Sequence, residues 1–96
     1  MTIRQLKNIS VAQFESFLEL AQCVFVRKKG GHSIYSRCDC NRPIVFQNHI
    51  QPVPEFILKN NLRVLSYSKD DFFNILEGLE IVEREGDIFK FQIKDK

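Results

Sequence analysis

The chain has 96 residues, a formal net charge of +2 and 44% hydrophobic residues, and nine of its residues are Phe. This length and composition predict one globular domain spanning 1–96 and exclude a disordered or fibrous chain. No run of about 18 apolar residues occurs, so we expect no membrane-spanning helix. Three cysteines without an apolar signal segment predict free thiols and a cytoplasmic location.

The net charge hides an asymmetry between the two parts of the chain. Residues 1–63 contain nine Lys and Arg against four Asp and Glu, a balance of +5. Residues 64–96 contain five against eight, a balance of −3. The basic part is therefore where we expect a polyanionic partner such as RNA.

The first expected element is a helix that begins after Ser10. Ser10 and Gln13 have the spacing of a capping box, in which each side chain bonds the other residue's backbone N–H. Apolar residues then recur at intervals of three and four, which predicts one buried helix face over roughly three turns: Val11, Phe14, Phe17, Leu18 and Ala21.

Three short strands are expected next. Residues 23–29 are β-branched and aromatic, and Gly30-Gly31 predicts a tight hairpin turn because glycine tolerates positive φ. Residues 32–37 alternate and predict the second strand. After a turn at 39–41, residues 42–47 predict the third.

Two helices and a hairpin complete the expected order. Pro54, at the first helical position, opens a helix that runs to Leu65. Ser68 caps a short third helix that Gly78 ends. Segments 79–84 and 88–94 predict a hairpin across Gly86, with Phe89, Phe91 and Ile93 on one face and Lys90, Gln92 and Lys94 on the other. The result is an α+β fold with helices on one face of a three-stranded antiparallel sheet and the other face free.

The stretch around the Gly-Gly turn carries the candidate chemistry. Arg27, Lys28 and Lys29 run into the turn, and His32 opens the next strand. An imidazole there can take a proton from a ribose 2′-OH or give one to a leaving 5′-oxygen, while the cations bind phosphate. Arg27 and Lys29 share one strand face and Lys28 takes the other. The sequence does not decide which set accompanies His32.

Other polar residues are weaker candidates. Tyr35 lies three residues after His32, so we expect it on the opposite face as a packing residue, although the turn leaves it a candidate for the site. His49 is expected to be an exposed loop residue. Four further cations are candidate phosphate contacts: Arg37, Arg42, Lys59 and Arg63.

The cysteines do not point to a metal. Cys38-Asp39-Cys40 is a lone C-x-C, whereas structural zinc usually uses C-x₂₋₄-C. We therefore expect no metal site there, and we expect Cys23 to pack in the core.

The turn motif and its place in the chain resemble a known family. The motif consists of Phe25, Arg27, Lys29, Gly30, His32 and Tyr35. It follows a helix and precedes a short strand, the helix 54–65 and the segment 68–76. Over roughly residues 9 to 78 this arrangement resembles the HicA family of toxin–antitoxin ribonucleases.

The resemblance implies a double-stranded-RNA-binding-like α-β-β-β-α core (9–78), extended here by the hairpin 79–96. It implies an mRNA interferase, which is an endoribonuclease, with His32 as catalytic residue. Because the site is based on a histidine, we expect cleavage without a metal or cofactor, through attack of the 2′-OH. The resemblance also implies a HicB-like antitoxin protein that covers His32. We expect the following residues to contact RNA: Arg27, Lys28, Lys29, Gly30, Gly31, Tyr35 and Arg37.

Two features depart from the family pattern. Many members have Ser where this chain has Gly31, directly before the histidine. The hairpin 79–96 is an addition, and its Glu80, Glu83 and Glu85 are expected on a solvent or protein-facing side because carboxylates repel RNA.

Two other functions fit the same sequence. One is a non-catalytic RNA-binding module on the same fold, which Gly31 and the solitary histidine of the motif favour. The other is a protein-interaction module, for example an antagonist encoded by a mobile element, which the acidic hairpin favours.

Overall fold

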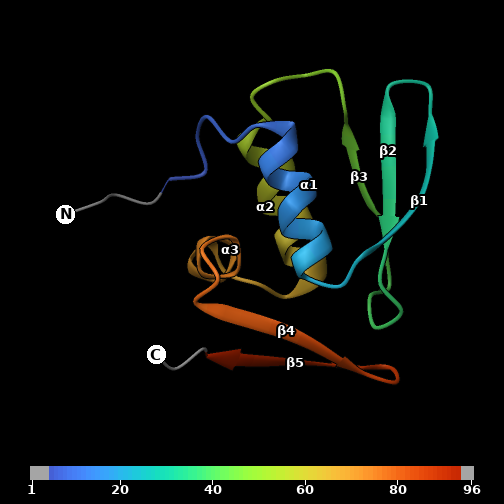
Figure 1. Cartoon of the computed structure of the whole chain (residues 1–96). Helices are drawn as coiled ribbons and strands as arrows, with labels where there is room; N and C mark the ends of the chain where they lie inside the picture. The colour runs from blue at the N-terminus through green and yellow to red at the C-terminus, as the bar shows by residue number, and fades with distance from the viewer. Residues whose placement is uncertain (1–4, 94–96) are drawn as a thin grey trace.

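The computed structural model describes residues 5–93 and confirms the expected α+β class and element order (Figure 1). No helix in this range is long and apolar enough to cross a membrane. The elements in chain order are α1 (Val11–Leu20), β1 (Val24–Lys29), β2 (His32–Ser36), β3 (Ile44–Gln47), α2 (Glu55–Leu65), α3 (Lys69–Leu76), β4 (Glu80–Glu85) and β5 (Ile88–Ile93).

Helix α1 begins at the predicted capping box. The Ser10 hydroxyl accepts a hydrogen bond from the Gln13 N–H at 3.0 Å, and the Gln13 side chain accepts one from the Ser10 N–H at 2.9 Å. Such a cap stabilises a helix by about 1 kcal/mol. The predicted apolar stripe is buried along its whole length, and Phe14 and Phe17 are fully inaccessible.

Strands β1, β2 and β3 form one antiparallel sheet in the order β1-β2-β3. Helices α1 and α2 lie against one of its faces (Figure 1). On that face Ser33 and Tyr35 of β2, and Ile44 and Phe46 of β3, are buried. Cross-strand partners point to the same side, so the register defines the opposite side as well. We call that side the open face; it consists of Val24, Arg27, Lys29, His32, Ile34, Ser36, Val45 and Gln47.

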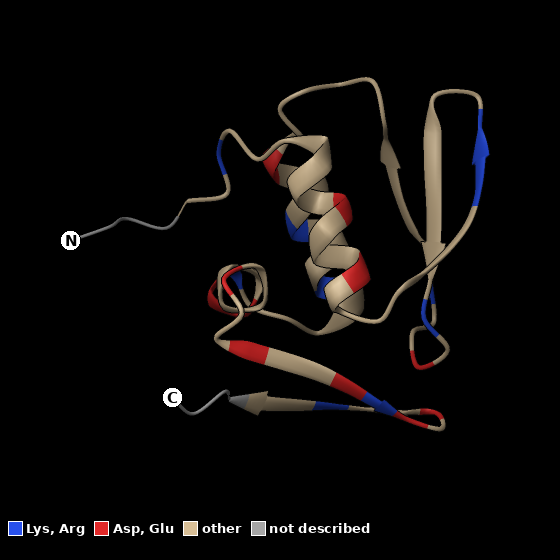
Figure 2. Ribbon diagram, viewed as in Figure 1, with Lys and Arg blue, Asp and Glu red and all other residues tan. Residues whose placement is uncertain are grey.

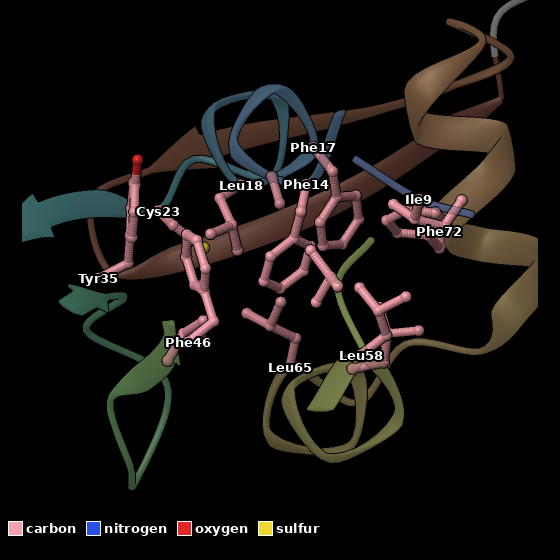
Figure 3. Packing of buried hydrophobic residues seen from close by; sticks show 14 of the residues in the cluster. Ile9, Phe14, Phe17, Leu18, Cys23, Tyr35, Phe46, Leu58, Leu65 and Phe72 are labelled. Carbon is pink, nitrogen blue, oxygen red and sulfur yellow. The ribbon is translucent and has the colours of Figure 1, made fainter. Parts of the chain in front are cut away.

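Aromatic side chains join the sheet to the helices in the core (Figure 3). The Phe14 ring of α1 meets Phe46 of β3 edge-on with centroids 4.9 Å apart. Phe17 packs on Phe72 of α3 at 4.7 Å. The core therefore lies between the covered face of the sheet and the helices. The open face takes no part in this core.

Helix α2 begins one residue later than predicted. Pro54 has an extended ψ of 140° and is the N-cap, so Glu55 is the first helical residue. The Pro54 carbonyl accepts the Leu58 N–H at 3.1 Å, as an N-cap carbonyl does. Further along, Asn61 is buried and its amide donates to the Val45 carbonyl at 3.2 Å, which ties α2 to β3.

The C-terminal elements follow the predicted signals. Ser68 and Asp71 form a capping box on α3, and Gly78, with φ of 78°, follows its C-cap. Hairpin β4–β5 turns at Gly86-Asp87, and Val82 on β4 belongs to the main hydrophobic cluster. The hairpin is thus packed into the same core as residues 9–78. The predicted faces of Ile93 and Lys94 lie outside the side chains that the structure describes.

The acidic residues of the hairpin do not share one environment. Glu83 and Glu85 are exposed, and Glu85 pairs with Lys90 at 2.6 Å. Glu80 is half-buried and accepts a hydrogen bond from the Asn74 amide at 2.6 Å. The expected exposure of these carboxylates is therefore confirmed for Glu83 and Glu85. Glu80 instead joins β4 to α3 through Asn74.

Candidate nucleic-acid interface

His32 is the first residue of β2 and its side chain is exposed on the open face. Its direct cross-strand partners are Lys29 on β1 and Gln47 on β3. Arg27 lies on the same face, opposite Ile34. Lys28 pairs with Ser33 and takes the other side. The question that the sequence left open is thereby answered: Arg27 and Lys29 accompany His32, and Lys28 does not.

The cations of β1 are not neutralised within the described part of the chain. The ion pairs between residues 5 and 93 lie elsewhere, at Arg37–Asp39, Lys59–Glu55 and Lys90–Glu85. Strands β1, β2 and β3 contain no acidic residue. Figure 2 shows the basic segment of β1 next to the hairpin turn. This edge of the sheet therefore carries uncompensated positive charge, which attracts phosphate.

The hairpin turn is built from two glycines with different roles. Gly30 has a φ of 61°, a conformation that favours glycine, whereas Gly31 does not need positive φ. A Cβ on Gly31 would lie 2.6 Å from Nδ1 of His49. Gly31 thus leaves room for a neighbouring side chain, and its own backbone does not require glycine.

His49 lies against the hairpin turn, a neighbourhood that the sequence did not predict. It sits two residues after β3 and is an exposed loop residue, as expected. Two hydrogen bonds of Asn48 fix this loop on the hairpin: its N–H donates to the Gly31 carbonyl at 2.8 Å and its amide donates to the Ser33 hydroxyl at 3.0 Å. Only the strand register could have revealed this neighbourhood, because 17 to 18 residues separate the two segments in sequence.

Tyr35 is not part of the open face. It is 6% exposed on the covered side of β2, where its ring stacks on Phe46 at 6.0 Å and meets Phe25 edge-on at 5.3 Å. Burial raises the pKa of its hydroxyl, and Glu15 and Glu19 add to the shift. This confirms the expected packing role of Tyr35 on the opposite face and removes it from the candidate RNA contacts.

Arg37 is also corrected, because its guanidinium is inside the protein and only 6% of the residue is exposed. Nε and Nη2 donate to the two carboxylate oxygens of Asp39 at 2.7 and 2.9 Å. Nη1 donates to the Ala21 carbonyl at 2.9 Å and to the Tyr67 hydroxyl at 2.6 Å. The ring of Phe89 covers the guanidinium at 4.4 Å. Arg37 joins α1, the β2–β3 loop and the C-terminal hairpin, and it is not available to phosphate.

Hydrogen bonds and burial both shift the pKa values of the groups around Arg37. Burial lowers the pKa of Arg37, but the hydrogen bonds to Asp39 and Tyr67 outweigh it and raise the pKa overall. The hydrogen bonds from Arg37 hold the pKa of Asp39 below its ordinary value. Burial raises the pKa of the Cys23 thiol to about 12, so this core cysteine stays protonated. The pKa of Cys40 is raised for the same reason.

The remaining candidate phosphate contacts lie away from His32. Lys59 is engaged by Glu55 at 3.1 Å. Arg42 and Arg63 line an open groove of about 730 Å³ between the β2–β3 loop and α2, together with Asn60 and Asn61. Arg42 and Arg63 therefore lie beside α2, apart from the cations of the open face.

Nothing within residues 5–93 brings three or more His, Cys, Asp or Glu side chains together as a metal site would require. The open face itself carries the imidazole of His32 and the cations of Arg27 and Lys29. Comparison of the chain with protein-family models, with curated proteins and with solved structures gave no match.

Proposed function

We propose that this chain is a HicA-like toxin, a metal-independent endoribonuclease that binds mRNA on the open face and cleaves it with His32. One observation carries the proposal: the β1–β2 register sets an exposed imidazole beside two unpaired cations, Arg27 and Lys29, on one sheet face. The helix, three antiparallel strands and helix in that order support the double-stranded-RNA-binding-like fold that the family resemblance implies.

The proposed reaction needs only groups that the chain carries. The ribose 2′-oxygen attacks the adjacent phosphorus, the bond from phosphorus to the 5′-oxygen breaks, and a 2′,3′-cyclic phosphate and a 5′-hydroxyl end result. His32 moves a proton at one of these oxygens. Arg27 and Lys29 stabilise the charge that builds on the phosphoryl oxygens.

A protein partner that covers the same face is the second part of the proposal. The open face is not purely basic: Val24 is 55% exposed and Val45 is 36% exposed, and the neighbouring Val26 is 51% exposed. Exposed apolar residues grouped on one face are typical of protein interaction sites. A HicB-like antitoxin in the cytoplasm would cover these residues and His32 together.

The experiment that tests the function uses one RNA oligonucleotide and its all-deoxy counterpart. The purified protein should cleave the RNA in the presence of EDTA, leave the DNA intact and yield 2′,3′-cyclic phosphate ends. Binding of the RNA without cleavage would instead support the non-catalytic RNA-binding module. Absence of both binding and cleavage would contradict the proposal.

A further inference from the structure

The groove between the β2–β3 loop and α2 carries two cations that the open face does not use. Its volume of about 730 Å³ lies in the range of clefts that hold small ligands, about 300–1,000 Å³. The charged residues in its lining are Arg42, Arg63 and Asp39. Arg42 and Arg63 are exposed, and neither belongs to an ion pair within residues 5–93. The groove therefore offers two unpaired guanidinium groups.

The negative groups near the groove are already engaged. Both carboxylate oxygens of Asp39 accept hydrogen bonds from Arg37, at 2.7 and 2.9 Å. At the C-terminal end of α2, the carbonyls of Leu62 and Arg63 accept the N–H groups of residues 67 and 66 at 2.9 and 3.1 Å. The groove therefore has a net positive charge, which suits a phosphate.

The groove adjoins the open face at the edge of the sheet. Strand β3 is the edge strand next to α2 (Figure 1), and Asn61 of α2 bonds the carbonyl of Val45. Val45 belongs to the open face and also lines the groove. It lies two residues before Gln47, the cross-strand partner of His32, which is about 7 Å along a strand. A stacked nucleic-acid strand covers this distance in about two nucleotides at roughly 3.4 Å each.

We propose that this groove holds phosphates of the same RNA strand that the open face binds, an inference that rests on the proposed function. Arg42 and Arg63 are the contacts, because a guanidinium can form two parallel N–H···O bonds to a phosphate and stays charged. They lie outside the reacting linkage, so they increase affinity and take no part in proton transfer. RNA that continues around the β3 edge therefore binds more tightly than RNA that covers only the open face.

The test measures the full chain on two RNA lengths. Affinity is measured for an RNA of about 12 nucleotides, within the roughly 4–16 nucleotides that single-stranded sites span per domain. Its 2′-O-methyl groups prevent attack by the 2′-oxygen, so binding is read without cleavage. The value of kcat/KM is measured for cleavage of an unmodified trinucleotide, whose reacting linkage has to lie at His32.

The variants are Arg42→Gln and Arg63→Gln, singly and together. Lys90→Gln on β5, outside the groove lining, removes the same charge and is the matched control. Thermal unfolding shows whether each variant is folded. Because the two arginines lie on different elements, either single variant tests the groove by itself.

We expect each single groove variant to lower the slope of log affinity against log salt by about 0.7, the value for one phosphate contact of a single strand. The double variant should bind the longer RNA on the order of 10-fold more weakly at about 0.1 M salt. Lys90→Gln should behave as the wild type, and all variants should keep the wild-type kcat/KM for the trinucleotide.

Three results would separate the inference from the proposed function. Wild-type affinity for the longer RNA in the folded groove variants would overturn the inference and leave the function standing if the wild type cleaves the trinucleotide. An equal loss in Lys90→Gln, or an equal loss in trinucleotide cleavage, would also overturn it. Loss of affinity confined to the groove variants, with no RNA cleavage by the wild type, would support the groove and overturn the ribonuclease function.

Discussion

Lys29 and His32 are directly opposed in the β1–β2 hairpin, so an ammonium group and an imidazole share one exposed sheet face. Lys28, the adjacent residue on the same strand, points to the other side. The pair of lysines therefore provides a matched comparison in which the charge is the same and only the face differs.

Replacing Lys29 by Ala should weaken RNA binding and lower the salt dependence of the affinity by about one phosphate contact. Lys28→Ala should change both quantities less, because its ammonium lies off the open face. The measurement is the dissociation constant of an RNA oligonucleotide at several salt concentrations. Equal losses in the two variants would contradict the assignment of the open face as the RNA surface.

Arg37 should matter for stability rather than for RNA binding. Arg37→Ala removes the buried donor of the Ala21 carbonyl and the Tyr67 hydroxyl. Leaving a buried polar group without its partner costs about 1–3 kcal/mol, so this variant should lower the free energy of unfolding by an amount of this order. Arg27→Ala, on the exposed face, should stay within about 0.5 kcal/mol of the wild type. Urea unfolding distinguishes the two. A small loss for Arg37→Ala would mean that the guanidinium does not join the elements as described.

The Arg37–Asp39 pair should also make stability depend on acid pH. Since the fold lowers the pKa of Asp39 from its ordinary value of 3.8, the folded state favours the carboxylate. The stabilisation is therefore present above that value and is lost as the pH falls through the folded pKa. The difference in free energy of unfolding between wild type and Asp39→Asn should narrow below about pH 4. A difference that is constant from pH 7 to pH 3 would rule this linkage out.

The local signals in the sequence were sufficient for most of the fold. The capping boxes at Ser10 and Ser68 begin α1 and α3, and the turns at Gly30-Gly31 and Gly86-Asp87 form the two hairpins. These features depend on residues close together in the chain, which is why the sequence predicts them. The predicted start of α2 was wrong by one residue, because the fixed φ of Pro54 suits both the N-cap and the first helical position.

The site was less predictable because it depends on long-range neighbours. The alternation of side chains separated Lys28 from Lys29, but only the register shows which of them accompanies His32. Arg37 has the sequence character of a surface cation, and its burial depends on Ala21, Tyr67 and Phe89, which come from three other segments. His49 reaches Gly31 only because β3 pairs with β2.

The contact between Gly31 and His49 makes a prediction about stability. Gly31→Ala should displace the His49 ring and cost about 1 kcal/mol, as overpacking does. In a His49→Ala background the same change should cost less, because the ring is no longer there and Gly31 does not need positive φ. Urea unfolding of the two single variants and the double variant gives the coupling, which we expect to be at least about 0.5 kcal/mol. Additive effects would show that the two residues do not compete for space.

The proposed ribonuclease function depends most on His32. The decisive measurement is the rate of RNA cleavage by His32→Ala under single-turnover conditions, together with its RNA affinity and its unfolding temperature. We predict a folded variant that still binds RNA and cleaves it at least about 100-fold more slowly than the wild type. Cleavage at the wild-type rate by the folded variant would contradict the account.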